Sequence, residues 1–482
     1  MAILILLVPQ FLFAQTVFNI LSYGAVPDSI SNNTAFIQKA VDECYEKGGG
    51  TVYVPAGKFL TGTIRLKSNI NLYLEAGAVL KGSPSVGDYP SIGISTEQRN
   101  NSLIVAINAD NITISGRGTI DGNGRSYVTQ ENHSDFDFDR NLVRQKEKYM
   151  VFSGLAPDGP YAMKERPGVL ILLINCNNVL LKDFSIYDAP NWCLHLGGCR
   201  YTNIQSLNIL NSLFIPNADG IDASNCQYLN INNCNIIAGD DGIAISPCAD
   251  GFCSKPSENY TVSNCNIVSR SAGIRVGYGV NDIRNIVFQN INIQSNRGIG
   301  LFVRQNQHIE NVLFSNIIIQ TAFMNGVWWG NGDPIHISAV PQTTDTTIGQ
   351  IRNIRFSNLR IESENGIDIY SISKGHIRDI VFDGISLLLK KGPLTNAYGG
   401  NFDLRPVHDM SLKVFRHDIA ALYAFQAEGI TVANMRLEWE GLLPAYFNHG
   451  LWFQKTSGVD VKNITLVHAP ASLKGKSTSV ED

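Results

Sequence analysis

Two short stretches of the chain share the tripeptide Asp-Gly-Ile, NADGID at residues 217–222 and GDDGI at residues 239–243. Their Gly-Ile pair recurs at 273–274, 298–299 and 366–367. The step from Gly220 to Gly242 fits one coil of a stacked repeat. We therefore predict that each Gly-Ile pair marks the same point on successive coils, with Ile pointing into a core.

The residues before each Gly form a column along this repeat. They are Asp219, Asp241, Ala272, Arg297 and Asn365. Strands that pair in register place Asp219 and Asp241 roughly 5 Å apart, and Asp240 joins them from the next position. Crowded carboxylates repel one another, so stability alone does not explain them. The sequence predicts an active site here.

Composition favours a β-rich fold and excludes two classes of protein. Of 482 residues, 44% are hydrophobic, only 17% are charged and 43 are Gly, which suits a turn-rich β structure. A net charge of −4 gives no electrostatic footprint for nucleic acid. No apolar run after the first residues approaches transmembrane length.

A second repeat, of two short β runs around a polar turn that often contains Asn, dominates the chain from about residue 103. Copies begin at Asn178, Thr202, Leu229, Tyr260, Ile286, Val312, Ile354, Ile380, Ile430 and Val461. Most steps are roughly 23–31 residues long, and such units bury their apolar faces only by stacking. We predict one all-β domain over residues 16–473, a parallel β-helix with Asn ladders, and an N-terminal cap containing a helix from Asn33 to Lys47.

The sequence predicts a different kind of segment at each end of the chain. Residues 1–15, MAILILLVPQFLFAQ, read as a signal peptide, which predicts a periplasmic or secreted protein. Residues 474–482 are expected to be disordered.

Among nine Cys, Cys248 and Cys253 flank a short loop and could form a disulfide. Five others are expected to pack inward: Cys176, Cys199, Cys226, Cys234 and Cys265. No Cys or His spacing indicates a metal site.

Long insertions between copies are candidate walls of a cleft. They cover residues 121–165, 320–350 and 388–426, and loops of this length are usually functional or disordered. Trp328 and Trp329 lie in the second insertion. Together with Trp192 they are candidate platforms for stacking sugars, although a single Trp more often packs in a core.

Three clustered Asp residues can supply both groups that glycoside hydrolysis needs. One protonated acid serves the leaving oxygen, and one ionised carboxylate activates water or attacks carbon. Mutual repulsion raises at least one pKa. The alternatives are that Asp219 and Asp241 merely end strands, or bind a structural Ca²⁺.

The chain resembles glycoside hydrolase family 28, the polygalacturonase family, over almost its whole mature length. The resemblance rests on residues 18–24, 48–57, 74–77, 118–122, 166–167 and 190–192, on His195 and on the two Asp stretches. It implies a right-handed parallel β-helix and inversion of configuration by a single displacement, without a cofactor. It also implies that Asp240 is the general acid, and that Asp219 and Asp241 hold and deprotonate the attacking water.

Two departures from the family pattern bear on the substrate. Where the family has Gly-His-Gly, this chain has residues 271–273, SAG, and where the family has Arg-Ile-Lys it has residues 300–302, GLF. We hypothesise that Arg275 restores a contact to a substrate carboxylate, with Arg297 and Arg304 nearby. The competing interpretation is that Arg275 pairs with a carboxylate such as Asp222 or Asp241.

His195 could take over hydrogen bonding from the missing family His, or be an ordinary histidine at a strand edge.

We expect a monomeric hydrolase that binds pectic polysaccharide or oligosaccharide, with a galacturonosyl linkage favoured. The alternatives are a hydrolase for another sugar, such as a rhamnogalacturonan unit, a non-catalytic carbohydrate-binding β-helix, and a polysaccharide lyase.

Overall fold

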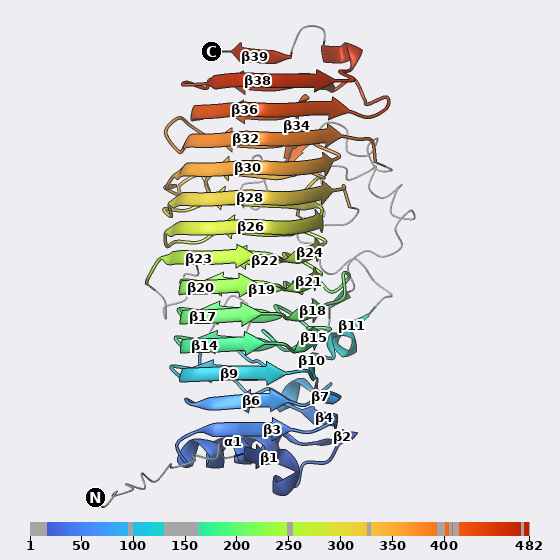
Figure 1. The fold of residues 1–482 in the computed structure, drawn as a ribbon, viewed down its shortest axis with the longest axis vertical. Helices are drawn as coiled ribbons and strands as arrows, with labels where there is room; N and C mark the ends of the chain where they lie inside the picture. The colour runs from blue at the N-terminus through green and yellow to red at the C-terminus, as the bar shows by residue number, and fades with distance from the viewer. Residues whose placement is uncertain are drawn as a thin grey trace, which may run out of the picture.

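The computed structural model describes residues 17–94, 100–129, 162–163, 165–247, 254–324, 329–392, 401–403, 407, 414–473 and 477–481. Its strands stack along one long axis as a right-handed parallel β-helix, with the first helix at one end (Figure 1). The predicted fold class is therefore confirmed. The predicted signal peptide, Cys248, Cys253 and Trp328 lie outside the described residues.

Two parallel sheets carry most of the strands. The 22-stranded sheet contains β1 (Val17–Asn19), β2 (Asp28–Asn32), β3 (Gly50–Val54), β4 (Gly57–Thr61), β6 (Ile70–Leu74), β7 (Ala78–Gly82), β9 (Asp110–Gly116), β10 (Thr119–Asp121), β14 (Asn177–Lys182), β15 (Ser185–Tyr187), β17 (Arg200–Gln205), β18 (Asn208–Leu210), β20 (Gln227–Asn232), β21 (Asn235–Ala238), β23 (Ser257–Ser263), β24 (Asn266–Ser269), β26 (Ile283–Ser295), β28 (Ile309–Thr321), β30 (Ile351–Ser363), β32 (Ile377–Leu389), β36 (Glu428–Trp439) and β38 (Asp460–Val467).

The 13-stranded sheet contains β5 (Ile64–Arg65), β8 (Ile104–Ile107), β13 (Ile171–Ile174), β16 (Leu194–Gly197), β19 (Ile221–Ser224), β22 (Ile243–Ile245), β25 (Ala272–Gly277), β27 (Arg297–Val303), β29 (Ile335–Ala339), β31 (Ile367–Ser371), β35 (Ile419–Phe425), β37 (Phe447–Gln454) and β39 (Thr478–Glu481). Two antiparallel pairs complete the strands of the described residues: β11 (Val128–Thr129) with β12 (Ala162–Met163), and β33 (Asn401–Asp403) with β34 (Val414–Arg416).

The N-terminal helix α1 (Thr34–Glu46) covers the first coils, as predicted. It buries Ile37, Ala40, Val41 and Cys44 on one face, which is the spacing of an amphipathic helix. Four short 3-10 helices are also described: η1 (Ile20–Tyr23), η2 (Val86–Asp88), η3 (Gly124–Tyr127) and η7 (Ala471–Leu473). The helix therefore shields the start of the core, the task that we expected of a cap.

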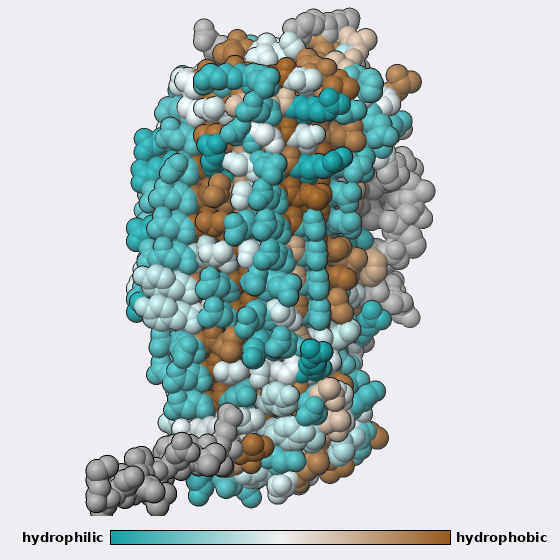
Figure 2. Space-filling view, in the orientation of Figure 1, coloured by the Kyte–Doolittle hydropathy of each residue, from teal (hydrophilic) through white to brown (hydrophobic). Residues whose placement is uncertain are grey.

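Side chains of one kind repeat in register from coil to coil. In the core, Phe288, Phe314, Phe356 and Phe382 stack with ring centroids 4.9 Å apart, which is the strand spacing of a sheet. On the surface, hydrophobic and hydrophilic residues gather in stripes along the long axis (Figure 2). Neighbouring coils thus repeat the same environment at each position.

The predicted Asn ladders are present at the turns. Asn353 Nδ2 donates to Asn311 Oδ1 at 2.6 Å, and Asn311 Nδ2 donates to Asn285 Oδ1 at 3.1 Å. All three residues have positive φ, between 54° and 58°. Asn tolerates this left-handed conformation better than most residues, so one residue type both turns the chain and links the coils.

The C-terminal segment corrects one expectation. Strand β39 pairs in parallel with β37, with Thr478 opposite Leu451, so the prediction of disorder over 474–482 is wrong for these residues. The exposed edge of β37 offers backbone hydrogen bonds that a polar sequence can accept as readily as an apolar one.

The seven described Cys residues are free and buried, which confirms the predicted inward packing of five of them. No helix among the described residues is long and apolar enough to cross a membrane.

Candidate active site

The two Asp stretches meet on adjacent strands of the 13-stranded sheet. Asp219 precedes β19 and Asp241 precedes β22, and Ile221 lies opposite Ile243. The backbone N–H of Gly220 donates to Asp241 O at 2.9 Å. The predicted column is therefore real, and one carboxylate oxygen of each of Asp219, Asp240 and Asp241 lies within 4.8 Å of the others.

The glycines of the motif let these coils approach closely. A Cβ atom on Gly220 would lie 2.4 Å from Gly242 O and 2.6 Å from Ile236 Cγ2. A Cβ atom on Gly242 would meet Ile267 Cγ2 at 2.3 Å. Because real Cβ atoms do not approach so closely, only Gly keeps the two carboxylate-bearing turns in register.

Burial sets the electrostatics of the three carboxylates. Asp219, Asp240 and Asp241 are only 3–4% exposed. Burial, followed by repulsion from Asp222 and the other two carboxylates, raises the pKa of Asp219 well above its usual range. Burial and repulsion from Asp241 raise the pKa of Asp240 to about 7, against opposing contributions from a Ser271 hydrogen bond and the Arg275 charge. Asp240 can therefore keep its proton near neutral pH, as a general acid requires.

Arg275 lies beside Asp241, on β25. Its Nε donates to Asp241 Oδ2, and its Nη1 donates to Ser246 Oγ at 2.5 Å. The backbone N–H of Ala272 donates to the other oxygen of Asp241 at 3.1 Å. A cation and an N–H donor favour the ionised carboxylate. The structure contains the ion pair between Arg275 and Asp241 that one of the two interpretations of Arg275 describes. The other interpretation, a contact between Arg275 and a substrate carboxylate, stays a prediction.

Trp192 and His195 lie at the edge of the same site. Trp192 is 5% exposed and packs in a small apolar cluster with Leu172 and Val105. His195 lies opposite Asp222, its Nε2 is 3.1 Å from Ser224 Oγ, and its ring meets that of Trp192 at 86°. Burial lowers the pKa of His195 to about 4, so its ring is neutral near pH 7. Their substrate-binding roles stay predictions.

Trp329 reaches the triad of Asp219, Asp240 and Asp241 through its backbone. Its N–H donates to Ser271 Oγ at 3.2 Å, and Ser271 itself hydrogen-bonds Asp240. The insertion around residue 329 therefore does border the site, as expected of a cleft wall. Its half-buried ring remains a candidate platform for a sugar.

Arg297 and Arg304 are held inside the protein. Arg297 is 1% exposed, and its Nε lies 2.6 Å from Asp333 Oδ2. Arg304 is fully buried and donates to Ser338 O and Ser338 Oγ at 2.9 and 2.7 Å. Both guanidinium groups lie over the Phe302 ring. These contacts give both residues a structural role, and binding of substrate by them stays a prediction.

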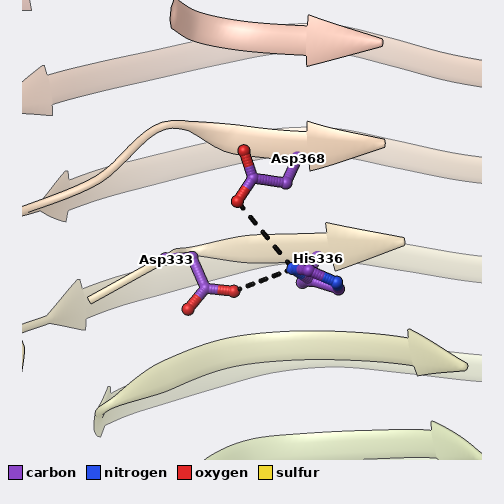
Figure 3. Close-up of side chains that lie close together, drawn as sticks. All are labelled: Asp333, His336 and Asp368. Atoms are coloured by element: carbon purple, nitrogen blue, oxygen red, sulfur yellow. Dashed lines mark ion pairs between the residues drawn. The ribbon is translucent and has the colours of Figure 1, made fainter. Parts of the chain in front are cut away.

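Sequence analysis missed a second polar cluster on this sheet, made of Asp333, His336 and Asp368 (Figure 3). Asp333 stands in the predicted column, between Arg297 and Asn365, but Pro334 replaces the Gly that marks the other coils. The pattern Asp-Pro-Ile was the available signal. Burial alone would raise the pKa of Asp333, but the Arg297 charge and a His336 hydrogen bond lower that pKa to about 2. Burial raises the pKa of Asp368 to about 6.

Several known proteins are similar to this chain. It is 32% identical over 273 residues to an exo-poly-alpha-D-galacturonosidase of Dickeya chrysanthemi, covering 50% of this chain and 44% of that protein. It is 29% identical over 240 residues to a probable polygalacturonase of Vitis vinifera, covering 47% and 43%. The chain thus spans less than half the length of these relatives.

Solved structures share the fold. A family 28 exopolygalacturonase of Yersinia enterocolitica superposes with a TM-score of 0.65 at 19% identity, covering 95% of this chain and 79% of that one. An exopolygalacturonase of Thermotoga maritima gives 0.59 at 20% identity, covering 94% and 92%. The family model for glycosyl hydrolases family 28 matches residues 44–392. The chain belongs to glycosyl hydrolases family 28.

Proposed function

We propose that this protein hydrolyses galacturonosyl linkages in pectic polysaccharide or oligosaccharide. The observation that carries the proposal is the difference in environment among three adjoining carboxyl groups. Burial and repulsion from Asp241 raise the pKa of Asp240 to about 7, whereas Asp241 is paired with the Arg275 cation. An acid and a base side by side are what glycoside hydrolysis requires.

The roles follow from these environments. Asp240 donates its proton to the glycosidic oxygen as the bond to the leaving group breaks. Asp241, paired with Arg275, accepts a proton from the attacking water. Asp219, one coil away, holds that water from the other side. The glycosidic oxygen, which leaves as a hydroxyl group, and the attacking water are thus served by different carboxyl groups.

Inversion is the expected stereochemical course, because it is general for the family. Yet one oxygen of each carboxyl group lies within 4.8 Å of the others, closer than the separation of about 6.5–9.5 Å common to inverting enzymes. Proton NMR of the first-formed product anomer resolves this. A β-anomer from an α-linked substrate would support water held by Asp219 and Asp241. An α-anomer would instead make one of them a nucleophile.

A second candidate is hydrolysis of a different pectic linkage, such as one in rhamnogalacturonan. It is favoured by Gly300 and Phe302, which stand where the family carries an Arg and a Lys. Gly300 lies opposite Arg275 in the sheet, so the neighbouring coil offers no cation of its own at that position. A substrate without a carboxylate there would lose nothing.

Product release separates these functions. Wild type and Asp240→Asn are compared on polygalacturonate, rhamnogalacturonan and defined oligosaccharides, with reducing ends and ultraviolet absorbance both recorded. Release of reducing ends by wild type alone, without absorbance, supports a hydrolase and names its substrate. Absorbing products would indicate a lyase. Binding without release by wild type would indicate a carbohydrate-binding module.

Secretion and a monomeric state belong to the same proposal. The apolar segment at residues 1–15 supports export to the periplasm or medium, and a polymeric pectic substrate is met there. Mass spectrometry of the N-terminus after expression, with cell fractions compared, tests the cleavage. Light scattering on the purified protein tests the monomer.

A further inference from the structure

The cluster of Asp333, His336 and Asp368 lies on the same sheet as the triad but farther along it. His336 belongs to β29 and Asp368 to β31, and the two residues are opposite each other in the sheet. In strand order, β25 and β27 separate β29 from β22. All three side chains are at most 4% exposed. The catalytic roles assigned above use none of them.

The separations within the cluster match those of metal ligands. His336 Nδ1 lies 3.2 Å from Asp333 Oδ2 and 3.8 Å from Asp368 Oδ2 (Figure 3). The three ligand atoms lie within 4.8 Å of one another. Ligand bonds of about 2.0–2.2 Å place neighbouring ligand atoms about 3.0–3.5 Å apart, so a small closure of Asp368 suffices.

Asp368 supplies an independent reason to expect a ligand. Its residue is 3% exposed, and its Oδ2 has no hydrogen-bond partner in the described part of the chain. That oxygen points toward His336 Nδ1 (Figure 3). Buried carboxylates are costly unless they are hydrogen-bonded, paired or bound to a metal. The 3.8 Å contact with His336 is within ion-pair distance but is too long for a hydrogen bond, so this oxygen lacks a close partner.

The surrounding groups fit the outer shell of such a site. His336 Nε2 lies 3.1 Å from Ser338 Oγ, and a second hydrogen bond of this kind orients metal-binding imidazoles. Arg297 Nε donates to Asp333 Oδ2 at 2.6 Å, and the Asn331 N–H donates to Oδ1 at 2.9 Å. These donors fix the carboxylate, which has about four lone-pair sites in all.

We propose that Asp333, His336 and Asp368 bind one divalent metal cation of the Zn²⁺ or Mn²⁺ type. An imidazole with two carboxylates suits such cations, whereas Ca²⁺ takes six to eight oxygen ligands. The ion would tie β29 to β31. It would also place positive charge one coil beyond Gly300, which lies opposite His336 in the region where the family's Arg and Lys are missing.

Metal content and metal affinity test the proposal. Protein stripped with a chelator is dialysed against Zn²⁺, Mn²⁺ or Ca²⁺, and bound metal is measured by mass spectrometry, with thermal unfolding alongside. We expect one Zn²⁺ or Mn²⁺ per chain and a higher Tm, with weaker binding of Ca²⁺. Asp368→Asn and His336→Gln should each weaken binding on the order of 100-fold or more, since outer-shell changes alone cost 10–100-fold.

The triad offers a matched control, because its three carboxylates also offer ligand atoms within 4.8 Å of one another. Asp241→Asn removes a buried carboxylate without touching the proposed ligands, so one metal per chain should remain. Loss of binding in Asp241→Asn but not in Asp368→Asn would place the ion at the triad and overturn the proposal. So would binding by neither wild type nor variants, which would leave a buried network of ion pairs among Arg297, Asp333, His336 and Asp368.

Discussion

Removal of the Arg275 charge should move the whole pH profile of activity to higher pH. Arg275 contacts Asp241 and lowers the pKa of both Asp240 and Asp219. A unit charge acting over about 6–8 Å at an effective dielectric constant of about 20 is worth roughly 2–3 kcal/mol, or about 1.5–2 pKa units. In Arg275→Gln, Asp240 and Asp219 therefore keep their protons to higher pH.

The assay is kcat/KM as a function of pH for wild type, Arg275→Gln and Arg275→Lys. We expect both limbs of the Arg275→Gln profile to rise by about 1–2 units. Arg275→Lys retains the charge, so its limbs should stay within about half a unit of wild type while its rate falls, because the Nε contact is lost.

A matched control is Arg284→Gln. Arg284 Nε lies 2.7 Å from Glu258 Oε2, and this ion pair is away from the triad. Its profile should not move. If Arg275→Gln lost activity with both limbs unmoved, Arg275 would not set the ionisation of the triad. A rise in KM for acidic substrates alone, with limbs unmoved, would instead revive its role as a substrate ligand.

Three further predictions concern stability. The pKa of Asp240 is raised in the folded state, so its stabilising effect is present below about pH 4 and is lost as pH rises toward 7. Asp240→Asn should therefore leave the free energy of unfolding unchanged at pH 4 and raise it by a few kcal/mol at pH 8. Equal effects at both pH values would contradict the raised pKa. Gly220→Ala, whose Cβ would lie 2.4 Å from Gly242 O, should cost about 1–3 kcal/mol in denaturant unfolding. Gly87→Ala is the control and should cost less, because its Cβ would meet nothing closer than Ser85 Oγ at 3.6 Å. Phe314→Ala, in the middle of the phenylalanine stack, should cost about 3–5 kcal/mol, and a cost below 1 kcal/mol would mean that the core closes over the cavity.

Much of the fold could be predicted because a β-helix repeats its chemistry along the sequence. Ile221, Ile243, Ile274 and Ile299 are all fully buried, as the Gly-Ile repeat predicts. Each coil contacts its neighbours in sequence, so a local pattern also describes long-range packing. The same logic places Asp219 beside Asp241 from the sequence alone.

The sequence by itself thus determined the stacked fold, its Asn ladders and the three carboxylates, since all of these follow from residues repeated at one coil's spacing. Only the tertiary structure decided what depends on the length of each insertion. Pro334 carries Asp333 into the column after a long insertion, and β39 returns to the sheet after a polar segment. Only the three-dimensional register brings Asp368 to His336, and only side-chain packing makes Asp241 the carboxylate that Arg275 contacts. Spacing fixes which coil a residue occupies, but the burial and the partners that set its charge are properties of the folded neighbourhood.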